Sequence, residues 1–445
     1  MNLNLRSFDR ENLRASFNQI DWHPSGKVTD VVGTVVEAHL PGSRLGTVVS
    51  INVRGQKDVL AEVVGFSRGK ALLIPYSSLS GIAPGCAVSG NRTWDRVPVG
   101  DFLLGKVVDP LMNPLEGRLD LPERPHMAPL EKEAPNPLRR SRVVDQFKMG
   151  IRAIDSMLTF GEGQRVGVMA GSGVGKSVLM GMIARGSAAD VNVIGLVGER
   201  GREVREFIER DLGPEGLARS VVVCSTSDQT PLMRLRAAKA TTAIAESFSQ
   251  QGKRVLLMMD SLTRVAMAQR EIGLAIGEPP TTKGYPPSVF SILPKLLERC
   301  GPQVDGHGSI SGLYTVLVDG DDFNDPIPDA VRSILDGHIN LSRSLAAKGH
   351  FPAIEVATST SRVMRDIVDD EHWQLASTVR QLIGVYQENI DYIQIGSYQQ
   401  GTNPTLDAAI TLMPAIEQFL RQGIDERSSL QEALQGMRDI FKRGK

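Results

Sequence analysis

The strongest constraint on the fold of this chain is a glycine-rich segment of eight residues, Ala170–Ser177, between two apolar runs. The run before it, Val166–Met169, is typical of a buried strand, and the apolar spacing from Val178 onward is helical. A glycine loop between a strand and a helix N-terminus lets backbone N–H groups converge on phosphate oxygens. We therefore predict a phosphate-binding loop (P-loop) that binds a nucleoside triphosphate.

Each residue of this loop has an expected role. Lys176 would reach the β and γ phosphates, and the Ser177 hydroxyl would ligate Mg²⁺. Ala170 stands where such loops usually begin with glycine. The phosphate-binding backbone groups would come from five residues: Gly171, Ser172, Gly173, Val174 and Gly175.

Two acidic residues after apolar runs complete a predicted hydrolytic site. Asp260 ends the run Val255–Met259, where a carboxylate can hold Mg²⁺ through its water shell. Glu199 follows the run Ile194–Val197, where a carboxylate can orient the water that attacks the γ-phosphate, although the pattern alone does not separate it from later acids of the segment. Arg264 could either approach the phosphates or form a structural ion pair.

Composition limits the class of protein. A chain of 445 residues with 41% apolar residues is expected to form two or three domains. The balance of 50 basic and 51 acidic residues argues against a general nucleic-acid-binding surface.

No apolar run approaches the ~18 residues of a membrane span, and the N-terminus lacks a signal-peptide pattern, so we expect a cytoplasmic protein. Cys86, Cys224 and Cys300 fit no metal-ligand spacing and are expected to be buried thiols.

The N-terminal part divides into two predicted segments. Residues 1–25 form a helical segment, with an amphipathic helix over 8–21. Residues 26–95 alternate short β-rich runs with glycine, proline and serine turns, which is typical of a small closed β-barrel. The runs are Val31–Val36, Leu45–Val53, Val59–Gly65, Lys70–Pro75 and Ala87–Gly90.

The remaining chain is predicted to form a P-loop domain, residues 96–365, and a C-terminal helical domain, residues 366–445. The proline-rich stretch 122–139 is expected to cover the domain without a periodic element. Beyond it, strand-like and helical patterns alternate, so the fold class is α/β with a mostly parallel sheet. The predicted strands are Arg165–Met169, Val191–Val197, Ser220–Cys224, Val255–Met259 and Ser311–Val318. After Val363 the pattern is helical, with Pro404 and Pro414 as interruptions.

Further segments carry a resemblance to a known family. They are Gly198–Arg200, Met259–Arg264, Glu278–Phe290, Leu335–Ile339 and Phe351–Arg362. Together with the P-loop, they make the chain from about residue 26 to about 410 resemble the ATPases of flagellar and virulence type III secretion systems. These are relatives of the α and β subunits of F- and V-type rotary ATPases. The resemblance implies a RecA-like P-loop core between an N-terminal barrel and a C-terminal helical domain.

The resemblance also implies roles that spacing alone does not give. Glu199 would polarise the attacking water, Arg200 would support the site, and Arg264 would lie beside the phosphates. Arg362 would be an arginine finger acting on the neighbouring subunit's nucleotide, and Phe351 would stack on adenine. Because one chain carries both Glu199 and Arg362, it can build a complete ring, and the resemblance implies a homohexamer that uses ATP and Mg²⁺.

Partners follow from the resemblance as well. A negative-regulator or stator-like protein would bind the N-terminal helix, and a stalk-like protein and the export gate would meet the C-terminal domain. Export substrates and chaperones complete the set, and these partners would hold the protein peripherally at the inner face of the cell membrane. Three departures stand out. Gly396–Pro404 has no acid where rotary β subunits carry an acidic loop, so stalk contacts must differ. Glu355 replaces the usual Asp or Asn, and Ala170, in place of the first P-loop glycine, is a variant common in the secretion branch.

The preferred function is ATP hydrolysis that energises protein export through the flagellar type III apparatus. The virulence (injectisome) system is a second candidate, and Gly277–Phe290 and Gly396–Pro404 favour the flagellar branch. The P-loop and its acids would also fit an F/V-type catalytic subunit, an RNA-translocating hexameric ATPase, or a nucleotide-binding scaffold without turnover. No nucleic-acid partner is expected, because residues 26–95 offer few aromatic side chains for base stacking, namely Phe66, Tyr76 and Trp94.

Overall fold

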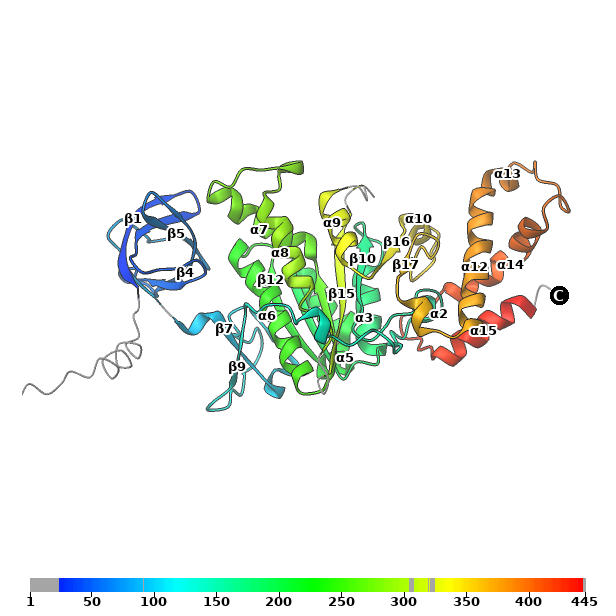
Figure 1. The fold of residues 1–445 in the computed structure, drawn as a ribbon, viewed down its shortest axis with the longest axis horizontal. Coiled ribbons are helices and arrows are strands. Elements are labelled where there is room, and N and C mark those ends of the chain that lie inside the picture. Colours follow the sequence, from blue (N-terminus) through cyan, green and yellow to red (C-terminus); the bar gives the residue numbers. More distant parts are fainter. Residues whose placement is uncertain (1–23, 91, 304–307, 319, 321–324, 443–445) are drawn as a thin grey trace, which may run out of the picture. The chain divides into compact units, whose positions relative to one another are not determined.

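The computed structural model describes residues 24–90, 92–303, 308–318, 320 and 325–442 (Figure 1). Contacts divide the chain into two compact units, Met1–Asp95 and Arg96–Lys445. The amphipathic helix predicted over residues 8–21 lies outside the described residues.

The first unit contains a closed barrel with strand order β1-β2-β5-β4-β3-β6. Alternate side chains of β4 point into its core, as expected for a sheet with one face buried. The predicted single strand Val31–Val36 is wrong, because the chain turns at Gly33 (φ 59°), a left-handed conformation that glycine adopts without strain. The strands are β1 (Ser25–Val32), β2 (Val35–His39), β3 (Val48–Ile51), β4 (Val59–Ser67), β5 (Lys70–Pro75) and β6 (Ala87–Gly90).

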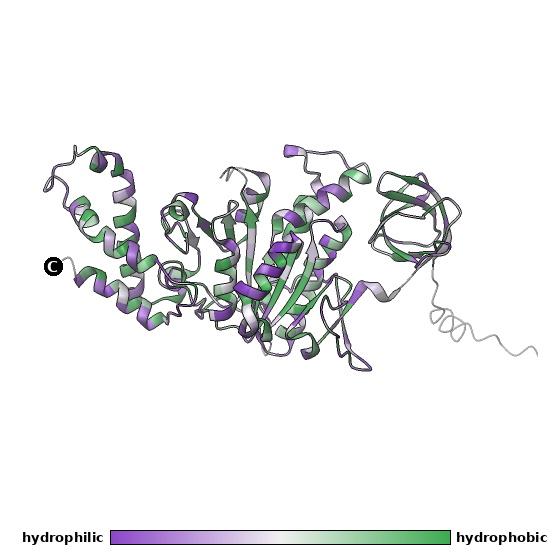
Figure 2. Ribbon diagram, turned by 180° about the vertical axis from the view of Figure 1, so that it is seen from behind, coloured by the Kyte–Doolittle hydropathy of each residue, from purple (hydrophilic) through white to green (hydrophobic). Residues whose placement is uncertain are grey.

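The second unit is built on a nine-stranded, mostly parallel sheet whose main order is β17-β16-β10-β15-β13-β11-β12-β8. All five strands predicted for this domain are present, and their buried residues colour the centre of the sheet as hydrophobic in Figure 2. They are β10 (Arg165–Ala170), β11 (Val191–Glu199), β12 (Ser220–Thr226), β13 (Arg254–Asp260) and β15 (Ser309–Leu317). Four strands were not predicted: β8 (Lys106–Val108), β14 (Gly301–Pro302), β16 (Gly337–Leu341) and β17 (Thr360–Ser361).

Helices cover both faces of this sheet (Figure 1). α6 (Pro231–Gln250) packs against β11, β12 and β13, and α7 (Leu262–Ala275) packs against β11 and β15. Thr230 caps α6 by accepting a hydrogen bond from the N–H of Met233. Other elements of the domain are α2 (Arg152–Met157), α3 (Lys176–Gly186), α4 (Gly201–Glu206), α5 (Gly213–Ala218), α8 (Pro287–Leu297), α9 (Pro326–Ile334), α10 (Arg343–Ala347) and α11 (Met364–Ile367).

The proline-rich stretch 122–139 contains two regular elements that the sequence did not predict, a strand and a 3₁₀-helix over Pro137–Arg139. β9 (His126–Pro129) pairs antiparallel with β7 (Arg96–Val99), and proline is tolerated there because the pair forms a separate two-stranded sheet with open edges.

The C-terminal region is helical, as predicted, and shares one hydrophobic core with the P-loop domain. α12 (Asp370–Glu388), α14 (Pro404–Leu420) and α15 (Leu430–Lys442) pack on one another and on α2, and α13 (Ile390–Gln394) follows α12. The two prolines do not interrupt helices: Pro404 is the first residue of α14, where its missing N–H costs nothing, and Pro414 lies inside α14. Within the described residues, no helix has the length and hydropathy to cross a bilayer.

Candidate active site

The P-loop lies where β10 ends and α3 begins. Gly173 and Gly175 have φ of 79° and 88°, and Gly175 directly precedes the first residue of α3. A Cβ on Gly171 would lie 2.7 Å from the Arg343 Nε atom, so a side chain there would collide with the Arg343 guanidinium. The sequence did not single out Arg343, which reaches the loop from α10, about 170 residues further along. The strand–loop–helix prediction is confirmed.

Lys176, Glu199 and Asp260 form a buried charge cluster beside this loop. The Lys176 Nζ atom lies 2.5 Å from Asp260 Oδ1 and 3.6 Å from Glu199 Oε1. Burial lowers the pKa of Lys176, but the carboxylates of Asp260 and Glu199 outweigh it, so the pKa is raised. The three residues that the sequence assigned to hydrolysis from separate strands therefore meet at one edge of the sheet, because parallel strands share their carboxyl ends.

Glu199 has an environment suited to a proton-accepting group. Burial raises its pKa to about 7, and the negative charge of Asp260 adds to the increase. Gly198, with φ of 72°, lies at a register shift between β11 and β12, and this bulge re-aims the residue that follows it. The bulge distinguishes Glu199 from the later acids of the segment, which the sequence pattern could not do.

Asp260 is held by a residue that the sequence analysis missed. The Thr315 hydroxyl donates a 2.6 Å hydrogen bond to Asp260 Oδ1 from the neighbouring strand β15. A single threonine inside an apolar strand gives no local signal of this role, because threonine is common in strands.

Arg264 lies on the first turn of α7 and packs against Gly198. A Cβ at Gly198 would lie 2.9 Å from the Arg264 Cβ, so glycine is needed for this approach. The Arg264 Nη1 atom is 3.7 Å from Met267 Sδ, and its buried Nε atom has no hydrogen-bond partner among the described residues. A buried N–H without a partner is costly, and a phosphate oxygen would satisfy it.

Three further residues that the sequence assigned to the site differ in how far they are exposed to solvent. The Phe351 ring is 46% exposed and comes within 3.6 Å of the position of a Cβ on Gly175. Ser177 is half-buried in the first turn of α3. Arg200 is 78% exposed and lies 3.6 Å from Glu203, so the structure does not bring its guanidinium into the charge cluster.

Arg362 lies at the opposite end of the sheet from the P-loop of its own chain. Its N–H donates to the Asp336 carbonyl, and the Asp336 N–H donates to the carbonyl of Arg165, the first residue of β10. The P-loop follows Ala170 at the other end of this strand, which is about 16 Å away at ~3.3 Å per residue. Arg362 therefore does not reach the phosphates bound by its own chain.

The cysteines are free thiols. Cys224 and Cys300 are buried as predicted, and burial raises the pKa of Cys224 to about 12, which makes its thiol unreactive. Cys86 is only half-buried, so the prediction is wrong for this residue.

A parallel α/β sheet with a P-loop, a strand-end aspartate and a buried glutamate defines a nucleotide-hydrolysing P-loop protein. Family models agree along the chain: the nucleotide-binding domain of the ATP synthase alpha/beta family matches residues 150–361, the beta-barrel domain of that family matches 28–90, and the T3SS EscN ATPase C-terminal domain matches 368–439.

Individual relatives are similar over nearly their whole length. The flagellum-specific ATP synthase of Bacillus subtilis is 54% identical, over 93% of this chain and 94% of that protein. The type 3 secretion system ATPase of Xanthomonas euvesicatoria is 50% identical, over 92% of each chain. A solved structure of the assembled ATPase EscN with its central stalk EscO, from the type III secretion system of enteropathogenic E. coli, matches with a TM-score of 0.85 and 44% identity, over 93% of this chain and 99% of that one. The chain belongs to the family of flagellar and type III secretion ATPases, and it is an ATPase.

Proposed function

We propose that this ATPase uses Mg²⁺ and a ring of identical subunits to energise protein export through a flagellar type III secretion apparatus. The observation that carries the proposal is the buried cluster of Lys176, Glu199 and Asp260 beside the P-loop, with Arg362 on the same chain but at the far end of β10. The cluster supplies one half of a hydrolytic site, and the arginine supplies the other half to a neighbour.

Ser177 and Asp260 are the residues that would hold Mg²⁺. Both offer oxygen atoms of the kind that Mg²⁺ prefers, and the Arg264 Nε atom, which has no hydrogen-bond partner among the described residues, is a donor that a phosphate oxygen would satisfy. When bound, Mg²⁺ neutralises charge on the phosphates.

Each residue of the site has a separate role in hydrolysis. Lys176 and Arg264 stabilise negative charge on the transferring phosphoryl group. Glu199 orients the attacking water and accepts its proton, and a pKa of about 7 suits this role at neutral pH. Phe351 stacks on the adenine ring, and Arg200 contributes from the exposed rim of the site.

A shared site requires an oligomer. Arg362 of one subunit would approach the γ-phosphate held by the next subunit, and a head-to-tail interface of this kind closes into a ring. We infer a homohexamer, in keeping with the assembled state named for the EscN relative.

The experiment that tests the shared site uses two variants. Arg362→Ala should lower the hydrolysis rate by about 10³–10⁵-fold, as expected for an arginine finger, and leave nucleotide binding intact. Mixing it with Glu199→Gln should restore part of the activity, because some interfaces then join an intact glutamate to an intact finger. Arg365→Ala, which removes an exposed arginine paired with Asp370, is the matched control and should change little.

No restoration in mixed rings of confirmed assembly would contradict the role of Arg362 in the neighbouring site. Phosphate release measures the rate, and a fluorescent nucleotide measures binding.

Partner contacts are proposed for the two ends of the chain. Tyr392 and Ile395 are 60% and 75% exposed beside the acid-free segment Gly396–Pro404, and we assign to them the contact with a stalk-like protein. An apolar contact replaces the charged one of rotary β subunits. The export gate, substrates and chaperones would act near this C-terminal domain, and a regulator would bind the N-terminal segment, so that partners hold the protein at the inner face of the membrane.

The injectisome system is the second candidate, supported by the 50% identical type 3 secretion ATPase. Restoration of motility in a strain lacking its flagellar export ATPase would favour the flagellar role. An RNA-translocating role has little support, since Tyr76 is buried in the barrel and donates its hydroxyl to Glu62, leaving its ring unable to stack on a base.

A further inference from the structure

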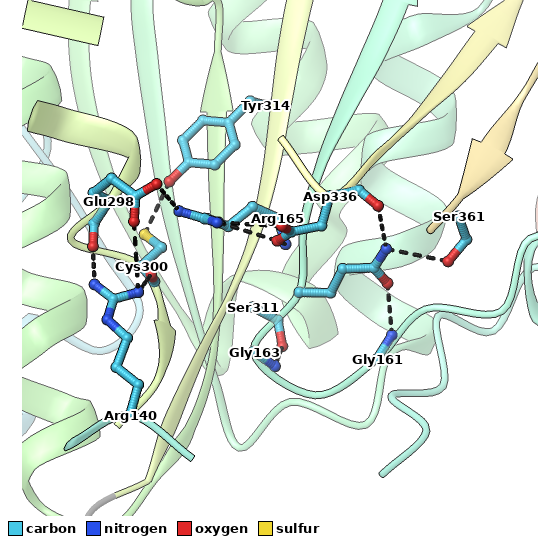
Figure 3. A network of polar contacts seen from close by, with 11 residues as sticks. Arg140, Gly161, Gly163, Arg165, Glu298, Cys300, Ser311, Tyr314, Asp336 and Ser361 are labelled. Atoms are coloured by element: carbon cyan, nitrogen blue, oxygen red, sulfur yellow. Dashed lines mark hydrogen bonds and ion pairs between the residues drawn. The ribbon is translucent and has the colours of Figure 1, made fainter. Parts of the chain in front are cut away.

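The segment Leu335–Ile339 is a marker of the family to which the active site assigns no role. In the structure, Asp336 belongs to a polar network around Arg165 at the amino end of β10 (Figure 3). Its carboxylate accepts hydrogen bonds of 3.1 and 3.2 Å from the Arg165 guanidinium, which also lies 2.7 Å from Glu298. The network therefore ties the first residue of β10 to the residue that precedes β16 and to the residue that follows α8.

Gln164 is the buried hub of this network and directly precedes β10. Its side chain is fully buried, and its Nε2 atom donates to the Asp336 carbonyl and to the Ser361 hydroxyl, both at 3.1 Å. Its Oε1 atom accepts a 2.8 Å hydrogen bond from the N–H of Gly161. Since both amide hydrogens and the carbonyl oxygen are engaged, the side chain has one favourable orientation.

The partners of Gln164 fix the backbone at Arg362 from two sides. Ser361 donates its hydroxyl to the Thr159 carbonyl at 2.9 Å while it accepts from Gln164. The Asp336 carbonyl that accepts from Gln164 also accepts from the Arg362 N–H at 3.0 Å. The Arg362 side chain is exposed and donates to the Arg332 carbonyl at 3.2 Å. The direction in which this side chain leaves the sheet edge therefore depends on the backbone that Gln164 holds.

We propose that Gln164 is the positioning residue of the arginine finger: its amide clamps Asp336 and Ser361 and so sets the place of Arg362 at the neighbouring nucleotide. This inference rests on the proposed shared site. Because Gln164 directly precedes the strand that ends in the P-loop, one strand supports the nucleotide of its own subunit and the finger for the next.

Gln164→Met tests this role, because methionine has a similar length and volume but makes none of the three hydrogen bonds. A finger displaced by about 1 Å is expected to lower the hydrolysis rate by about 10²-fold. The affinity for nucleotide should stay unchanged, because the P-loop lies at the other end of β10.

Mixed rings separate a displaced finger from a damaged nucleotide site. The Q164M chain mixed with E199Q should regain activity, since E199Q supplies a well-placed finger to the intact site of Q164M. The Q164M chain mixed with R362A should regain none, since neither chain offers a good finger. A variant that merely distorts its own nucleotide site would fail to recover with E199Q and would bind nucleotide more weakly, and this result would overturn the inference.

A second pair of variants keeps the test decisive if Q164M does not fold. Ser361→Ala removes only the hydroxyl and should show the same pattern of rescue, whereas Ser361→Thr keeps the hydroxyl and should retain wild-type activity. Equal hydrolysis rates for the wild type, Ser361→Ala and Ser361→Thr would contradict the positioning role of these hydrogen bonds. If R362A and E199Q do not restore each other's activity, both the proposed shared site and the role of Gln164 are contradicted. If they do restore activity, but Q164M or S361A mixed with E199Q does not, only the role of Gln164 is contradicted.

Discussion

The two ends of β10 are built in opposite ways. At the carboxyl end, Lys176 faces Asp260 and Glu199 in a tight charge cluster, and the nearby Arg264 Nε has no partner among the described residues. At the amino end, Gln164 and Arg165 make hydrogen bonds and ion pairs to Asp336, Ser361 and Glu298.

The carboxyl end leaves a donor that a ligand could satisfy. At the amino end the polar groups pair with one another, and Arg165 Nη1, which makes no hydrogen bond within the described residues, still forms an ion pair with Glu298 at 2.7 Å. Concentrated charge with an unmet donor is unfavourable for the folded protein alone, and it is retained where a substrate supplies the missing partner. A satisfied network holds the backbone in one conformation. Substitutions at the carboxyl end should therefore affect function more than stability, and substitutions of buried charges at the amino end should do the reverse.

The largest effect is expected at the carboxyl end. Lys176→Met removes the cation that we propose to contact the phosphates, so hydrolysis should fall by at least about 10³-fold, and nucleotide should no longer raise the melting temperature. The melting temperature without nucleotide should change little, because one of the two remaining carboxylates can take up a proton. Thermal unfolding with and without an ATP analogue measures both effects.

Lys239→Met is the matched control for this variant, since Lys239 forms an ion pair with the exposed Glu131 instead. It should keep both the activity and the thermal shift. A K176M protein still stabilised by nucleotide would remove the distinction between the two ends.

A second variant tests the amino end. Arg165→Met leaves Asp336 without its cation and leaves Glu298 with only Arg140, at 3.9 Å, and we expect the free energy of unfolding to fall by about 2–3 kcal/mol, below the range for fully buried pairs because both acids are partly exposed. Nucleotide affinity should remain within about twofold. Urea unfolding and nucleotide titration measure the two quantities.

Arg254→Met provides the comparison for the amino end, because the ion pair of Arg254 with Asp190 is exposed on both sides and should contribute about 1 kcal/mol or less. If R165M binds nucleotide much more weakly while its unfolding curve is unchanged, the assignment of a structural role to this end is wrong.

A third effect concerns pH. With a pKa of about 7 for Glu199, kcat/KM should fall about tenfold for each unit of pH below 7, because only the carboxylate accepts a proton. The same raised pKa affects stability. Protonated Glu199 favours the folded state below pH 4.5, its ordinary pKa, and this contribution is lost as pH rises through about 7.

The E199Q variant should therefore gain stability relative to the wild type between pH 5 and 8, by at most about 3 kcal/mol. Urea unfolding across this range measures the difference. A constant difference between the two proteins would contradict the raised pKa.

Patterns within a few residues predicted much of this protein. The P-loop and the five central strands followed from apolar runs and glycine spacing, and Asp260 followed from its place at a strand end. The same approach joined β1 and β2 into one strand, because a turn at Gly33 depends on backbone dihedral angles that apolar spacing does not reveal. It also left β16 and β17 unassigned, since strands of five and two residues carry little periodicity.

The sequence by itself determined which chemical groups are available: a phosphate loop, an aspartate and a glutamate at strand ends, and Arg362 on the same chain. Only the tertiary structure decided how these are arranged. The bulge at Gly198 distinguishes Glu199 from the later acids, and Thr315 donates a hydrogen bond to Asp260. Arg362 lies at the end of β10 opposite the P-loop, so it does not reach the phosphate-binding residues of its own chain. Such arrangements depend on contacts between residues far apart along the chain, which local patterns do not encode.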